Sequence, residues 1–269
     1  MFMSTGQLGS QTKISQYENM TMAASELKSL HGMSEVLLGL LESDTPIDVS
    51  EFGQARGMPK ATIYRYLSSL RAAGLIVRQR RGSYVPHPHF LRLLRRHDPN
   101  HVLGEYVRPY LQKLSADLGT TVHFGVLEDD MVTYIVKVEV DDETVFTQEN
   151  QQLEAYCSAI GKVLLANLPS AAIDEYLAVG DFPYLTPKTV THPGEIRKEL
   201  ARTRRRGYGM DSAEVDKQLY CLAVPVRDGR GNVLGAISAS RRSEEFVKEM
   251  KRATLISMRR VADDIQGRL

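Results

Sequence analysis

The spacing of apolar residues divides this chain near Gly119 and limits the folds open to it. Up to that point most apolar side chains recur at three and four positions, which predicts amphipathic helices. After it, the stretches Val122–Val126 and Val132–Val140 alternate with polar or small residues on either side of an acidic turn, which predicts a β-hairpin. A second hairpin is expected over 220–240. The sequence therefore predicts a helical first domain and an α+β second domain, with helices packed on an antiparallel sheet.

The first domain is expected over residues 25–96. Helical spacing and chain-breaking residues place three helices at 25–43, 50–57 and 59–73. In the second helix we expect Ser50 to be the N-cap, with Phe52 and Ala55 buried. The segment 75–85 then predicts a short two-stranded wing. This order of helix, tight turn, helix and wing is typical of a winged helix-turn-helix domain.

Positive charge is concentrated in this domain. Ten basic residues and no acidic residue lie between Ala55 and Arg96, whereas the whole chain has a formal charge of +1, so the remainder sums to −9. Such a concentration is expected of a module that neutralises phosphates, although charge alone leaves a merely solvated basic face as an alternative. The third helix favours nucleic acid, because a buried stripe of Ile63, Leu67 and Leu70 leaves an acid-free face opposite it.

That acid-free face supplies the predicted DNA contacts. The N-terminal end of a recognition helix meets base edges in the major groove, whereas basic side chains farther along the helix and in the wing reach phosphates. The predicted groove and base contacts are Lys60, Thr62, Tyr64 and Arg65. The predicted backbone contacts are Ser68, Arg71, Arg78, Arg80 and Arg81.

Three further segments complete the expected organisation. Residues 1–24 are polar and are predicted to form a flexible tail, and residues 97–118 are predicted to form an amphipathic connector helix. Residues 119–269 are expected to form the α+β second domain. Besides the sheet, this part should contain helices at 158–168, 170–178 and 193–206, and one long closing helix lined by Val247, Met250, Met258, Val261 and Ile265.

Composition and motif spacing argue against several classes of protein. Two cysteines without close spacing form no disulfide framework, which favours a reducing cytoplasm, and no apolar run approaches the ~18 residues of a membrane span. No cofactor or metal is expected, because the histidine pairs 87/89 and 97/101 are more typical of loops. No enzyme is expected, because neither Cys157 nor Cys221 with His123 has an evident third orienting group, and the segment around Gly161 departs from the phosphate-loop pattern.

Five short motifs follow one another along the chain, at Met58–Leu70, Tyr156–Ala166, Arg206–Asp211, Cys221–Val226 and Gly235–Ser240. Together they resemble the signatures of the IclR family of bacterial transcriptional regulators. The resemblance implies a winged helix-turn-helix domain, a GAF-like effector-binding domain, and a homodimer or homotetramer on a palindromic DNA operator. It implies a ligand-responsive regulator of a catabolic operon, with repression expected. A DNA-binding architectural protein whose second domain only oligomerises is the alternative.

The resemblance also implies a pocket for a small-molecule effector. Its residues in this chain would be Ala159, Ile160, Asp211, Cys221, Ser238 and Ser240. Amides that open the helix at Ala159 would favour a carboxylate or carbonyl oxygen. The expected effector is therefore a small oxygenated metabolite, such as an oxo acid, hydroxy acid, semialdehyde, lactone or aromatic acid. The chain departs from the family pattern at Gln218, where glycine is usual, and after Asp211, where the acids are reduced to Glu214 and Asp216.

Overall fold

The computed structural model describes residues 28–43, 45, 48–79, 83–140 and 145–267. The chain divides into two compact units, Met1–His97 and Asp98–Leu269. Each unit has its own apolar core.

The first unit contains helices around a small core and a two-stranded sheet. Residues 28–42 are helical, and the later elements are α2 (Val49–Arg56), α3 (Lys60–Ala72), β1 (Ile76–Arg78), β2 (Tyr84–Pro86) and α4 (Pro88–Leu94). Strands β1 and β2 pair antiparallel, with Val77 opposite Val85. Ile63, Leu67 and Leu70 are buried in this core. The predicted helix-turn-helix and wing are therefore present.

Two details of α2 differ from the prediction. Asp48, not Ser50, is the N-cap, because its Oδ1 accepts from the Ser50 amide at 2.7 Å and from the Glu51 amide at 3.1 Å. Ala55 is exposed, and Gly53 is buried in its place. A Cβ on Gly53 would lie 2.7 Å from Ile63 Cδ1, so the absence of a side chain lets α3 pack closely there.

The described residues of the second unit form a six-stranded antiparallel sheet in the order β5-β4-β3-β8-β7-β6. Its strands are β3 (Thr121–Glu128), β4 (Met131–Val138), β5 (Gln152–Glu154), β6 (Gly209–Ser212), β7 (Tyr220–Arg227) and β8 (Val233–Arg241). Its helices are α5 (Pro99–Leu118), α6 (Ala159–Asn167), α7 (Ser170–Val179), α8 (Pro193–Arg206), α9 (Glu245–Lys248) and α10 (Lys251–Gln266). Both predicted hairpins and the α+β class are confirmed.

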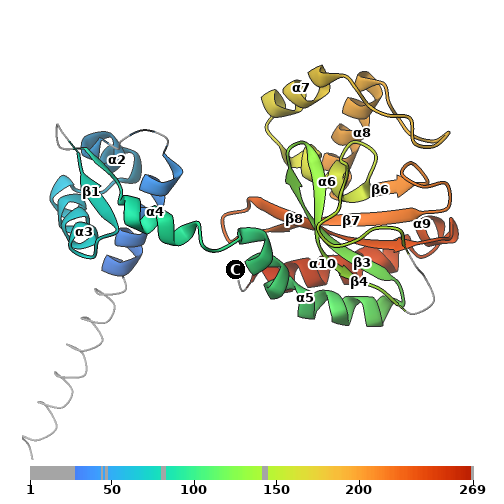
Figure 1. The fold of residues 1–269 in the computed structure, drawn as a ribbon, viewed down its shortest axis with the longest axis horizontal. Coiled ribbons are helices and arrows are strands. Elements are labelled where there is room, and N and C mark those ends of the chain that lie inside the picture. The colour runs from blue at the N-terminus through green and yellow to red at the C-terminus, as the bar shows by residue number, and fades with distance from the viewer. Residues whose placement is uncertain (1–27, 44, 46–47, 80–82, 141–144, 268–269) are drawn as a thin grey trace, which may run out of the picture. The chain divides into compact units, whose positions relative to one another are not determined.

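Helices cover both faces of this sheet (Figure 1). On one face α5, α9 and α10 pack over a core that includes Val122, Phe124 and Met258. On the other face α6, α7 and α8 pack over a core that includes Tyr134 and Cys221. Because successive strand residues point to opposite faces, β7 contributes Cys221 and Ala223 to one core and Leu222 and Val224 to the other.

The expected closing helix is two helices. Helix α9 ends near Glu249, whose amide donates to the Glu245 carbonyl at 2.7 Å, and α10 begins after Met250, whose carbonyl accepts from the Thr254 amide at 3.1 Å. Met250 lies at this break and is 42% exposed, so it does not line a helix face as predicted. Val247 lies on α9 and is buried.

Candidate functional site

The outer face of α3 is the candidate nucleic-acid interface. Its core side is closed by Ile63, Leu67, Leu70 and also Tyr66, which the sequence reading did not place inside. The outer side chains that the sequence singled out are exposed, apart from half-buried Thr62; they are Lys60, Tyr64, Arg65, Ser68 and Arg71. The first turn of α3 has no acidic residue, and its N-cap, Pro59, offers no side-chain cap. The positive end of the helix dipole is therefore not neutralised locally.

The wing contributes fewer described residues. Arg78 ends β1 and is exposed, opposite Tyr84 of β2. Arg80 and Arg81 lie outside the described residues. The structure thus brings Arg78 and the α3 face into one unit, and the two remaining wing arginines stay predictions.

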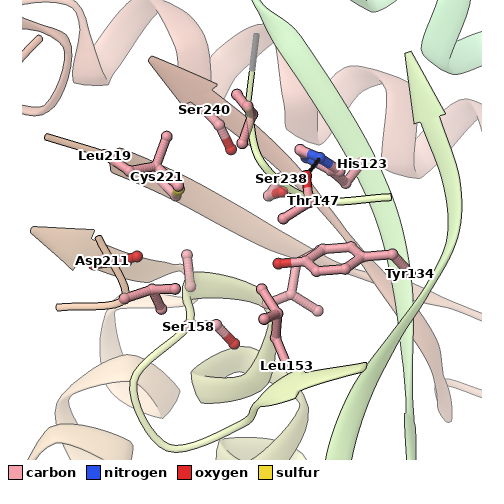
Figure 2. Close-up of a pocket in the computed structure, with 14 residues that line it drawn as sticks. His123, Tyr134, Thr147, Leu153, Ser158, Asp211, Leu219, Cys221, Ser238 and Ser240 are labelled. Carbon is pink, nitrogen blue, oxygen red and sulfur yellow. Dashed lines mark hydrogen bonds between the residues drawn. The ribbon is translucent and has the colours of Figure 1, made fainter. Parts of the chain in front are cut away.

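A buried polar cavity lies in the second unit, between the sheet and α6 (Figure 2). Strand register builds its floor: Asp211 of β6 lies opposite Cys221 of β7, and Cys221 lies opposite Ser240 of β8. Ser238, two residues before Ser240, shares the same face and lies opposite His123 of β3. Strands β6, β7, β8 and β3 therefore present polar groups to the same face of the sheet.

The start of α6 forms another wall. Ser158 caps this helix, and its Oγ accepts from the Gly161 amide at 3.1 Å. Ala159 and Ile160 follow it and also line the cavity. All six residues expected from the family resemblance are therefore brought together around one cavity.

The sequence reading missed several lining residues. His123, Tyr134, Thr147 and Ser158 also face the cavity, whereas the sequence suggests for His123 only the role of a base for a cysteine. The period of two could have located it, because Val122 and Phe124 belong to the core under α5, so His123 must point to the opposite face. Thr147 lies in an irregular segment and gives no comparable signal.

Burial controls the protonation of the cavity groups. Burial, with a smaller contribution from Lys137, lowers the pKa of His123 to about 3, so its imidazole is neutral. Burial raises the pKa of Asp211 to about 7, although Lys162 and the Glu214 amide act in the opposite direction. Burial also raises the pKa of the Cys221 thiol well above its usual value. The thiol therefore stays protonated, which argues against a nucleophilic cysteine.

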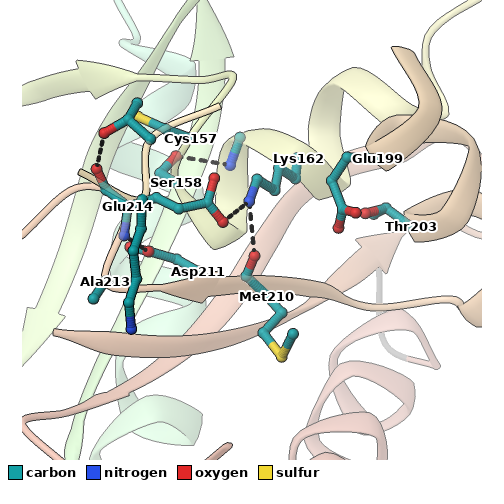
Figure 3. Close-up of polar contacts among 12 residues, drawn as sticks. Cys157, Ser158, Lys162, Glu199, Thr203, Met210, Asp211, Ala213 and Glu214 are labelled. Carbon is teal, nitrogen blue, oxygen red and sulfur yellow. Dashed lines mark hydrogen bonds and ion pairs between the residues drawn. The ribbon is translucent and has the colours of Figure 1, made fainter. Parts of the chain in front are cut away.

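A buried ion pair lies behind Asp211 (Figure 3). Lys162 of α6 is 2% exposed, donates to the Met210 carbonyl at 3.0 Å, and forms an ion pair with Glu214. The Glu214 amide in turn donates to Asp211 Oδ1 at 2.7 Å. Gly161 is equally structural, since a Cβ there would lie 2.1 Å from the Ala155 carbonyl oxygen. The Gly161-Lys162 motif thus supports the cavity wall and does not line it.

The cavity is narrow in this structure. Its lining bounds about 300 Å³ free of atoms, part of which is open solvent, and about 10 Å³ admits the centre of a water molecule. That is room for about one water. A metabolite of several heavy atoms therefore requires part of the wall to move.

Comparison with known proteins decides the family. Residues 99–267 match the model for the C-terminal region of the bacterial transcriptional regulator IclR. The chain belongs to the IclR family. RhmR of Escherichia coli K12, an uncharacterized HTH-type transcriptional regulator, is 30% identical to it over 203 residues, which are 75% of this chain and 78% of RhmR. Family relatives are thus transcriptional regulators that bind DNA, with a C-terminal effector-binding domain, and not enzymes.

Solved IclR-family structures have the same fold. The Thermotoga maritima IclR structure matches with a TM-score of 0.60 at 25% identity, covering 90% of this chain and 99% of that one. An IclR homolog complexed with 4-hydroxybenzoate, from Microbacterium hydrocarbonoxydans, matches with a TM-score of 0.59 at 22% identity, over 87% of this chain and 98% of that one.

Two further observations concern sites of other kinds. Among the described residues, none of the helices combines the length and apolar character that a membrane crossing requires. Over the same part of the chain, no three His, Cys, Asp or Glu side chains group in a way that could hold a metal ion.

Proposed function

We propose that this IclR-family protein is a cytoplasmic, ligand-responsive repressor of a catabolic operon that binds a palindromic operator as a dimer or tetramer. The observation that carries the sensing role is the cavity, where residues from all six strands, from the start of α6 and from two irregular segments meet in front of a buried ion pair. Repression is the simpler arrangement, because it requires only that the operator be occupied. The second candidate is an architectural protein whose second unit only oligomerises. In such a protein these converging polar groups would have no function.

The DNA-binding role rests on α3 and the wing. Lys60, Thr62, Tyr64 and Arg65 lie on the first turns of a helix whose opposite side is buried, as groove-reading residues must. Ser68, Arg71 and Arg78 lie farther along the same unit, where phosphate contacts are expected, and Arg80 and Arg81 are proposed to extend this set in the wing.

Arg65→Ala is expected to weaken operator binding by about 1 to 3 kcal/mol and to relax selectivity at one base position, because a base contact is lost. Arg71→Ala should weaken binding to all sequences alike and reduce the salt slope by ~1, because one phosphate contact is lost. Fluorescence anisotropy with a duplex selected by the wild type, over several salt concentrations, measures both. Arg92→Ala, on α4, is the matched control and should change affinity little. Normal operator binding by Arg65→Ala at moderate salt would contradict the assignment.

The effector role rests on the chemistry of the cavity. Ala159 and Ile160 place helix-start amides at one end, which suit a carboxylate or carbonyl oxygen. Asp211, Ser238 and Ser240 supply hydrogen-bonding groups along the floor, and Cys221 supplies a small neutral wall. We propose a small oxo acid, hydroxy acid, semialdehyde, lactone or aromatic acid as effector. The 4-hydroxybenzoate bound by a structural relative is a molecule of this class.

A thermal-shift screen tests this role. Small organic acids, aldehydes, lactones and aromatic acids, with 4-hydroxybenzoate among them, should include at least one compound that raises the melting temperature of the wild type. Ser240→Ala and Cys221→Ala should reduce this shift and leave operator binding intact. If both variants instead lose operator binding and no compound stabilises the wild type, the architectural alternative is favoured.

A further inference from the structure

Two irregular segments complete the cavity wall, and they are held differently. Residues 213–219 contribute Val215 and Leu219 and are fixed by buried bonds, in which the Ala213 and Glu214 carbonyls accept from Thr186 and Thr189 at 2.7 Å each. Residues 145–149 contribute Val145 and Thr147 and are held by charged and polar side chains, of which the Arg108–Glu149 pair is exposed. We call residues 145–149 the outer wall.

One hydrogen bond fixes the outer wall from inside the cavity. Thr147 Oγ1 lies 2.7 Å from His123 Nε2, and both side chains are buried (Figure 2). The other ring nitrogen of His123, Nδ1, is buried and has no hydrogen-bond partner among the described residues. A neutral imidazole has one donor and one acceptor nitrogen, so His123 can exchange Thr147 for a ligand oxygen without a change of charge.

Charged groups fix the outer wall from the other side. Lys137 Nζ donates to the Val145 carbonyl at 2.7 Å and also to the Thr147 carbonyl. Glu149 accepts from the Lys137 amide at 2.8 Å and from both terminal nitrogens of Arg108, at 2.8 and 3.2 Å. The Arg108 bonds lower the pKa of Glu149, so the pair is ionised at neutral pH.

Arg108 lies on α5, the helix that follows the boundary between the two units at Asp98. The next residue is Pro109, which has no amide hydrogen and so cannot donate to the Glu105 carbonyl. Helix α5 therefore lacks one backbone hydrogen bond beside Arg108. A shift of the wall would reach α5 through the ion pair of Arg108 with Glu149.

We propose that the outer wall moves when an effector replaces Thr147 as the hydrogen-bond partner of His123, and that the Arg108–Glu149 ion pair transmits this movement to α5. The proposal rests on the proposed sensing function. It adds two residues that respond to the ligand, His123 and Thr147, and a route from them to α5. A ligand oxygen that bonds to His123 favours the displaced wall, because it takes the place of Thr147. A ligand larger than one water also favours the displaced wall, because the cavity otherwise has room for about one water. The effector then shifts the protein between two states by its differential affinity for them.

The test uses the full chain and two matched pairs of variants. Thr147→Val removes the inner hydrogen bond, and Thr133→Val removes a buried hydroxyl that bonds to Gln152 and does not line the cavity. Glu149→Gln weakens the tie to α5, and Glu105→Gln removes the other carboxylate near Arg108, 3.4 Å from its Nε. Each pair changes the same chemical group by the same replacement.

Hydrogen exchange of α5 is the first measurement. We expect faster amide exchange over residues 104–112 in both Thr147→Val and Glu149→Gln, and wild-type exchange in the two controls. Thr147→Val is the decisive variant, because the hydroxyl that it removes bonds to His123 and not to α5. Unchanged exchange in this variant would overturn the proposal, whether or not the protein binds DNA.

DNA affinity is the second measurement, with the duplex selected by the wild type. Couplings between sites are typically about 5- to 150-fold, so Thr147→Val and Glu149→Gln should change the Kd by at least about fivefold, in the same direction. The controls should stay within about twofold. Opposite directions, or no change in either variant, would refute the route to α5. If the wild type selects no duplex, the proposed function is refuted. The proposal for the outer wall is then tested by the exchange measurement alone.

Discussion

Lys162→Met is expected to lower the unfolding free energy of the second unit by about 3 to 5 kcal/mol, because it leaves the buried carboxylate of Glu214 without its counter-ion. Methionine keeps much of the length of the lysine stem, so the loss reports charge and hydrogen bonding more than volume. The Met210 carbonyl loses its donor as well. Urea denaturation followed by far-UV circular dichroism measures the change, and suits a chain without tryptophan.

Two further variants separate the ion pair from its surroundings. Arg197→Met breaks the pair between Arg197 and Asp174, whose side chains are 48% and 57% exposed, and should cost at most about 1 kcal/mol. Lys162→Met combined with Glu214→Leu removes both buried charges and should recover much of the lost stability. If Lys162→Met lowered the unfolding free energy no more than Arg197→Met does, the ion pair of Lys162 and Glu214 would not be what stabilises this wall of the cavity.

The pH dependence of stability should change most at Asp211. Burial raises its pKa from 3.8 to about 7. Between these values the folded protein keeps a proton that the unfolded chain has released, so this group's stabilising contribution is full below about pH 4 and is lost as pH rises to about 7. Asp211→Asn has no such proton, and its amide oxygen can still accept from the Glu214 amide.

The stability of Asp211→Asn relative to the wild type should therefore increase between pH 4 and pH 8, by on the order of 2 to 4 kcal/mol. Urea denaturation at several pH values within this range measures it. Asp228→Asn should show no such increase within this range, because a hydrogen bond from Asn232 lowers the pKa of the exposed Asp228 and its titration therefore lies at lower pH. Relative stability of Asp211→Asn that is constant or falls with rising pH would show that the carboxyl is ionised in the folded state.

Elements with a clear period and clear stops were predictable from sequence. Helix α3 and the hairpin of β7 and β8 were placed within a residue or two, because apolar spacing and turn residues agree there. Helix α4 was missed, since its seven residues follow directly on the wing and none of them is buried. The break between α9 and α10 was missed because no proline or glycine marks it.

The residues of the cavity also divide into those that the sequence predicts and those that it does not. The family resemblance supplied the six residues that meet there, and strand register explains why four of them share a face. It gave no role to Lys162, whose partner Glu214 lies 52 residues away, because contacts of that separation exist only in the folded chain. Thr147 was missed for the same reason, since its partner His123 lies on another element.

The alternation of β3 and its neighbours has a consequence for how such proteins diversify. Residues such as His123 and Ser238 face the cavity, while their chain neighbours Phe124 and Ile237 face the core under α5 and α10. A substitution at a cavity position therefore leaves the opposite core unchanged, whereas an insertion of one residue would exchange the two faces. Point mutation can thus change ligand preference while the opposite face is kept, and new specificities become accessible one residue at a time.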